Sequence, residues 1–112
     1  MRLSAAFLVF GALAAIVPPG QAQATSGPGC LRIVNVDPGD KLNIRRRPDA
    51  SSAVVARADP ANQGILHLDG KCRPASLAWK YRWCPVSYFS GGPSDPAKGW
   101  VKARFVRDSE CP

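Results

Sequence analysis

Proline and glycine interrupt this chain so often that no long helix fits between them. The 112 residues include 11 prolines and 10 glycines, and a proline inside a helix removes a backbone hydrogen bond and clashes with the preceding turn. The segments between them are short apolar runs, and no window keeps a helical period. Short apolar runs closed by turn residues are typical of β-strands. The chain is therefore predicted to be all-β, with the architecture of a small barrel or sandwich.

Six apolar runs are expected to form strands, and turn residues close most of them. The turns are expected at residues 37–40, at residues 59–62 and at Asp69-Gly70. A bend is expected at Pro85, because a proline inside a strand belongs at an edge or a bulge. Residues 90–98, SGGPSDPAK, form a loop rich in Gly and Pro. The six strands are expected to contain Leu31, Ile33 and Val36; Leu42 and Ile44; residues 53–58; residues 64–68; the aromatic residues 79–88; and residues 99–106.

The first 24 residues have the three parts of a secretory signal peptide. Arg2 supplies a positive start, residues 5–17 are uncharged and mostly apolar, and Ala22-Gln23-Ala24 offers small residues to a signal peptidase. A membrane anchor is the alternative, but this apolar run is shorter than the roughly 20 residues that cross a bilayer. Cleavage is expected after Ala24, which implies a periplasmic or secreted protein without a transmembrane anchor.

Removal of 24 of the 112 residues leaves 88, enough for one domain with a small core. Residues 25–30 are expected to form a flexible arm, and residues 31–112 the domain. The four cysteines are Cys30, Cys72, Cys84 and Cys111. Exported domains of this size often carry disulfides, and four cysteines permit three pairings. A metal site is not expected, because no CxxC pair occurs and His67 has no second histidine.

The domain is basic, and this charge limits the classes of partner that it is expected to bind. Without Arg2 the chain has 14 basic residues against eight acidic ones, a formal charge of about +6. Such a charge favours anionic cell-wall polymers, lipid head groups or acidic proteins. Nucleic acid would also be attracted electrostatically, but export makes it an unexpected partner.

Three segments in this order resemble the bacterial SH3 domain family of small extracytoplasmic barrels. LNIRRRP at residues 42–48 is similar to the family's Leu-Asn-hydrophobic-Arg-x-x-Pro, VVARADPANQGILHLDG at residues 54–70 has the order of a strand, a Pro turn and a strand, and GWVKARFV at residues 99–106 is similar to Gly-Trp-Val followed by an aromatic residue or Leu. Arg47 stands where the family commonly has Gly. The four cysteines and the loop at residues 90–98 also lie outside the minimal pattern.

The resemblance implies an SH3-like barrel of about five to six short strands. Because the first and last strands of such a barrel lie close together, it also implies a disulfide between Cys30 and Cys111, which leaves Cys72 to pair with Cys84. In SH3-like modules, grooves lined by aromatic residues receive extended or Pro-rich peptides.

No catalytic residue, metal ligand or cofactor is assigned from the sequence. General acid–base catalysis needs titratable groups within reach of one another, whereas His67 is the single histidine and Glu110 the single glutamate. His67 is expected to be a half-exposed strand residue. A small secreted basic ribonuclease remains an enzymatic alternative, because the size, charge and cysteines of the chain suit it.

The candidate ligand-binding residues are Arg46, Arg47, Tyr81 and Tyr88. Arg45 matches the family's pattern and is expected to form a hydrogen bond across a turn, which leaves Arg46 and Arg47 free to bind a carboxylate or phosphate. Among the aromatic residues, Trp83, Trp100 and Phe105 are expected in the core. Trp79, Tyr81 and Tyr88 are expected to line an open groove, since Tyr and Trp combine an apolar face with a polar tip.

The sequence therefore predicts an exported, non-catalytic SH3-like binding module. Its expected partner is a cell-wall peptide of peptidoglycan or a periplasmic or envelope protein, held in a groove of Tyr88, Tyr81 and Arg46. A first alternative is an inhibitor or accessory subunit of a secreted enzyme that makes contact through residues 90–98. The ribonuclease is a second alternative, and a structural domain without a specific ligand is a third.

Overall fold

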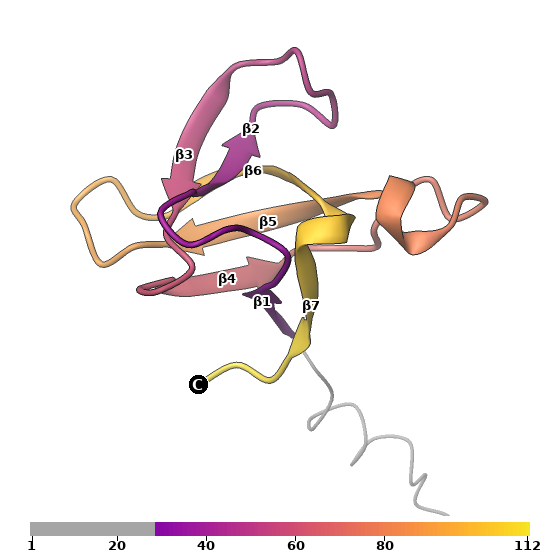
Figure 1. Ribbon diagram of the computed structural model, residues 1–112. Helices are drawn as coiled ribbons and strands as arrows, with labels where there is room; N and C mark the ends of the chain where they lie inside the picture. The colour runs from indigo at the N-terminus through magenta and orange to yellow at the C-terminus, as the bar shows by residue number, and fades with distance from the viewer. Residues whose placement is uncertain (1–28) are drawn as a thin grey trace, which may run out of the picture.

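The computed structural model describes residues 29–112 and shows an all-β chain, as expected (Figure 1). The predicted signal peptide, residues 1–24, lies outside the described residues. The same is true of residues 25–28 of the arm that was expected at residues 25–30. The elements are β1 (Cys30–Ile33), β2 (Leu42–Arg45), β3 (Val54–Ala58), β4 (Ile65–Leu68), the 3-10 helix η3 (Trp79–Tyr81), β5 (Trp83–Phe89), β6 (Ala97–Lys102), the 3-10 helix η4 (Ala103–Phe105) and β7 (Val106–Ser109).

All seven strands belong to one antiparallel sheet in the order β3-β2-β6-β5-β4-β1-β7. This is more than the five to six strands expected. Within residues 29–112, no pairing joins the edge strands β3 and β7, so the sheet is not closed into a barrel.

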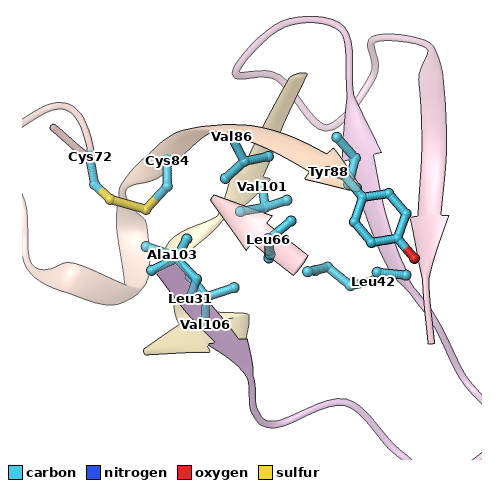
Figure 2. Close-up of a cluster of buried hydrophobic side chains, with 12 residues drawn as sticks. Leu31, Leu42, Leu66, Cys72, Cys84, Val86, Tyr88, Val101, Ala103 and Val106 are labelled. Carbon is cyan, nitrogen blue, oxygen red and sulfur yellow. A yellow bond between two sulfur atoms is a disulfide. The ribbon is translucent and has the colours of Figure 1, made fainter. Parts of the chain in front are cut away.

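The sheet curls around a single core, which draws residues from strands at both ends of the strand order (Figure 2). Leu31 of β1 and Val106 of β7 belong to the same buried cluster as Leu42 of β2, although β2 and β7 lie near opposite ends of the sheet. A flat sheet could not bring these side chains together. The largest fully buried side chains are Leu31, Ile44, Leu66, Cys84, Val86, Val101 and Val106.

Two expected strands are interrupted by 3-10 helices. Residues 79–88 do not form one strand: Trp79–Tyr81 is η3, and β5 begins at Trp83. Residues 99–106 are also divided, because η4 separates β6 from β7. The physical reason is that β6 pairs with β5 whereas β7 pairs with β1, so the chain must turn between them. The Ala103 N–H donates to the Arg82 carbonyl at 2.9 Å, which anchors that turn.

The turns at residues 37–40 and 59–62 and the two disulfides agree with the expectations, whereas the bend expected at Pro85 does not interrupt β5, which pairs with β6 in one register through Pro85. Asp40 N–H donates to the Asp37 carbonyl at 2.9 Å, and Gly39 between them has a φ of 89°, a conformation that glycine adopts without steric cost. Cys30 is bonded to Cys111 and Cys72 to Cys84. The first bond ties β1 to the C-terminal segment, and the second ties the segment after β4 to β5.

The curl of the sheet depends on a close approach between β2 and β6 at Gly99. An added Cβ at this position would lie 2.6 Å from the Arg45 carbonyl oxygen and 2.7 Å from Ile44 Cγ2. Both are far inside van der Waals contact, and one of the two atoms belongs to the backbone. Arg45 pairs with Trp100, the next residue of β6. Gly99 therefore permits the contact through which β2 and β3 join the rest of the sheet.

Replacing Gly99 with Ala is expected to lower the free energy of unfolding by about 1–3 kcal/mol, the usual cost of overpacking a tight site. Gly70→Ala is the matched control, because its Cβ would lie 3.5 Å from the Pro85 ring, an ordinary contact. Urea denaturation of both variants measures the difference. Equal stability of Gly99→Ala and the parent would show that β2 and β6 are not this close.

Candidate functional site

Tyr88, one of the expected ligand-binding residues, lies in the core. Its side chain is 6% exposed, and Figure 2 shows the ring among the buried side chains with the hydroxyl at one end. Burial, followed by the charges of Asp95 and Asp59, raises the pKa of the Tyr88 phenol above 10.0. A ring packed in this way has no open face for a ligand.

The remaining expected site residues are exposed but lie apart. Tyr81 is 53% exposed in η3, before the start of β5, whereas Tyr88 is near the end of that strand. Seven β5 residues span about 20 Å. Arg46 and Arg47 lie in the loop between β2 and β3 and are exposed. The structure therefore does not assemble the expected groove of Tyr88, Tyr81 and Arg46.

Arg45 has the structural role expected for it. Its Nη1 donates to the Ser52 carbonyl at 2.9 Å, across the loop that joins β2 to β3. Ser52 is buried and its hydroxyl donates to carbonyls of the same loop. Arg46 and Arg47 make no ion pair within residues 29–112.

A groove with a volume of about 560 Å³ opens elsewhere, between the loop that follows β1, strand β2 and the end of β6. This volume is within the usual range of small-ligand sites. Its lining combines two large aromatic side chains with charges of both signs. The lining residues are Asn35, Val36, Asp37, Asp40, Lys41, Leu42, Asn43, Arg45, Ala50, Trp83, Lys102, Arg104 and Phe105.

Two hydrogen bonds to η4 position one wall of the groove. Val34 N–H donates to the Phe105 carbonyl at 2.8 Å, and Asn35 Nδ2 donates to the Arg104 carbonyl at 2.9 Å. Asn35 has a φ of 58°, in the left-handed region that Asn tolerates better than most residues. The chain turns sharply there and places Asp37 and Asp40 on the rim.

Aromatic rings and cations from β5, β6 and η4 also line the groove. Lys102 Nζ lies 5.0 Å from the centroid of the Trp83 ring, and the Arg104 guanidinium carbon lies 5.3 Å from that of Phe105. Within the described chain, the ion pairs are Lys41 with Asp59 and Lys98 with Asp69, and His67 Nδ1 also contacts Asp69. Lys102 and Arg104 are therefore held over aromatic rings and have no carboxylate partner among residues 29–112. Asp37 and Asp40 have no cationic partner among the same residues.

The aromatic assignments from the sequence were thus partly reversed. Trp83 and Trp100, expected in the core, are half-buried and do not pack against the core cluster, and Trp83 lines the groove. Phe105 packs against the core, as expected, and also lines the groove. Trp79, expected in a groove, packs against the core, and its Nε1 donates to the Val106 carbonyl at 3.2 Å. A usable signal was present: Cys84, Val86 and Tyr88 alternate as buried residues of β5, so Trp83 must face the other side of the sheet.

A second polar cluster centres on Asp69, next to β4 and β5. Asp69 Oδ1 lies 2.9 Å from His67 Nδ1, and Asp69 Oδ2 accepts a hydrogen bond from the Ser87 hydroxyl at 2.6 Å. Lys98 Nζ donates to the same hydroxyl at 2.9 Å. His67 is a half-exposed strand residue, as expected. Because Ser87 and His67 both bond to Asp69 and not to each other, this cluster lacks the serine-to-histidine contact of a nucleophilic triad.

Comparisons with known proteins assign neither a family nor a function to the chain. No protein-family model, curated protein or solved structure matches the chain significantly. Among residues 29–112, no helix is long and apolar enough to cross a membrane. The same residues contain no group of three or more His, Cys, Asp or Glu side chains placed to hold a metal ion.

Stability is expected to fall at acidic pH through Asp69. Partial burial raises the pKa of this carboxyl, but the hydrogen bonds from Ser87 and His67 and the charge of Lys98 outweigh it and leave the pKa below the ordinary 3.8. A carboxyl group whose pKa is lower in the folded state than in the unfolded state stabilises the fold at pH values above its unfolded-state pKa. This stabilisation is lost as the pH falls through its folded-state pKa. Asp69→Asn should flatten the decline in melting temperature below about pH 4. If the melting temperature of Asp69→Asn falls below about pH 4 as steeply as that of the parent, this network does not contribute to stability.

Proposed function

We propose that the chain is an exported, non-catalytic SH3-like binding module whose groove holds an extended, charged segment of a cell-wall peptide or an envelope protein. The observation that carries this proposal is the pair of half-buried rings, Trp83 and Phe105, each beneath a cation that has no carboxylate partner within residues 29–112. Rings of this kind supply apolar contact area, and the free charges supply orientation.

The charge of the groove favours a carboxylate on the ligand. Four basic residues line it, Lys41, Arg45, Lys102 and Arg104, against the two acidic residues Asp37 and Asp40. Lys102 and Arg104 are free to donate to an anion, and hydrogen bonds to charged groups are stronger than neutral ones. The acidic side of the groove suits an amine on the same ligand. Stem peptides of peptidoglycan carry carboxylates and peptide hydrogen-bonding groups, so they are the first ligands to test.

Two further features support the proposal. Disulfides persist in oxidising compartments, so the bonds Cys30–Cys111 and Cys72–Cys84 fit a protein that works outside the cytoplasm. The order of the segments around Leu42, Val54 and Trp100 is similar to that of bacterial SH3 domains, and the curled antiparallel sheet suits such a module.

One observation favours the accessory-subunit alternative. The loop at residues 90–96 is ordered by Asp95, whose carboxylate accepts hydrogen bonds from Ser90 N–H, Gly91 N–H and the Ser90 hydroxyl. A loop held in one shape loses less entropy on contact with a partner. If this loop and not the groove makes the contact, then deleting residues 91–94 should abolish binding.

Arg104→Gln is expected to weaken binding of a purified stem tetrapeptide about tenfold or more, because a hydrogen bond to a charged group contributes about 1.5–3 kcal/mol. Arg107→Gln removes the same charge from the exposed face of β7 and serves as the matched control. Isothermal titration calorimetry measures both, with thermal melts to confirm folding. Equal losses in the two variants, or no binding by the parent to the peptide or to intact peptidoglycan, would reject the groove as the site.

A further inference from the structure

The outward face of β5 and β6 carries aromatic and cationic side chains that continue from the groove onto the open surface of the sheet. Residues directly opposite each other on antiparallel strands share a face. Trp100 is opposite Arg45 on one side and Pro85 on the other. Trp83 is opposite Lys102 and also forms an isolated bridge with Arg73. We call this set the cation–tryptophan face; it consists of Arg45, Arg73, Trp83, Pro85, Trp100 and Lys102.

This face is directed away from the core. Cys84 and Val101, the chain neighbours of Trp83 and Trp100, are opposite each other and fully buried. Successive residues of a strand point to opposite sides, so the two tryptophans point outward from neighbouring strands. Both are half-buried, which leaves part of each ring accessible.

Each tryptophan holds a cation against its ring. The Arg73 guanidinium carbon lies 5.5 Å from the Trp100 ring centroid, and Lys102 Nζ lies 5.0 Å from that of Trp83. Neither cation takes part in an ion pair within the described part of the chain. A cation held against an aromatic ring stays in place while its remaining N–H groups stay free. Two anion-binding groups are thus positioned in advance.

Positive charge exceeds negative charge on this face. Its cations are Arg45, Arg73 and Lys102, and the acidic residue beside it is Asp69, whose N–H donates to the Pro85 carbonyl at 2.9 Å. The Asp69 carboxylate is already bonded to His67 and to Ser87, and Ser87 is opposite Lys98 in the next part of the sheet. Lys98 adds a further positive charge there, with a side chain that is 73% exposed. The ligand that complements this face is therefore anionic.

The flat apolar surface between the two fixed cations suits a polysaccharide that carries charged groups. The Pro85 ring and the two indoles present C–H and aromatic surface, against which the apolar C–H side of a pyranose ring can pack. Carboxylates along the same chain can accept hydrogen bonds from Arg73 and Lys102. A sheet face is also open at both ends, so a polymer can extend beyond it.

We propose that the cation–tryptophan face binds an acidic polysaccharide, with its sugar rings against Trp100 and Pro85 and its carboxylates on Arg73 and Lys102. The face shares Arg45, Trp83 and Lys102 with the proposed peptide groove and goes beyond it through Arg73, Pro85 and Trp100, which do not line that groove.

Polygalacturonate oligomers are the probe, and Arg73→Gln is the main variant because its exposed side chain contributes little to the core. Arg73→Gln is expected to weaken binding about tenfold, the ratio expected from one charge-assisted hydrogen bond. Lys80→Gln is the matched control: Lys80 also lies over an aromatic ring, that of Tyr81 in η3, at 5.1 Å, but outside this face. It should bind within about twofold of the parent. Trp100→Ala, with Tyr81→Ala as its control, tests the aromatic contact in the same titrations.

Three results would overturn the proposal. They are no binding of polygalacturonate by the parent, equal losses in Arg73→Gln and Lys80→Gln, and polyphosphate of matched charge bound as tightly as polygalacturonate. The last two would mean attraction by net charge alone. Neutral dextran should not bind. If Trp100→Ala fails to fold in a thermal melt, Arg73→Gln and polyphosphate still decide the outcome. Stem peptide binding should survive Arg73→Gln, which separates this proposal from that of the groove.

Discussion

The structure depends on the close approach of β2 to β6 at Gly99, where a side chain larger than hydrogen would collide with the Arg45 carbonyl. Through this contact β2 and β3 join the other five strands, and Leu42 and Ile44 enter the same core as Leu31 and Val106. The contact also sets Arg45 beside Trp100. One steric constraint therefore shapes both the core and the surface on which the proposed binding residues lie.

Local chemistry in the sequence was sufficient to predict the strands that end at turns. The Asp37 to Asp40 turn needs a positive φ that Gly39 supplies, and Leu42 and Ile44 alternate as buried residues of β2. The 3-10 helices η3 and η4 were not predicted, because their causes are distant in the chain. The turn at η4 depends on the Ala103 to Arg82 hydrogen bond and on the pairing of β7 with β1.

The candidate site was the least predictable part. Trp79, Tyr81 and Trp83 occur at every second residue, as in a strand, so one continuous strand was expected over residues 79–88. η3 interrupts that strand, and the side chains of β5 that face the core are those of Cys84, Val86 and Tyr88. Phe105 could not be assigned to a groove, since the neighbouring lining residues Asn35 and Asp37 are far away in sequence. The role of Arg45 was predictable because its hydrogen bond is local.

The three tryptophans allow a direct test of whether the groove is the binding site. Each indole N–H gives its own signal in a ¹H–¹⁵N correlation spectrum, and Trp79 is a built-in reference because its Nε1 is bonded to the Val106 carbonyl at 3.2 Å. On titration with a stem tetrapeptide, the Trp83 indole signal should shift saturably while that of Trp79 stays in place. A peptide that binds while moving Trp79 and leaving Trp83 unchanged, or that moves neither signal, would contradict the account.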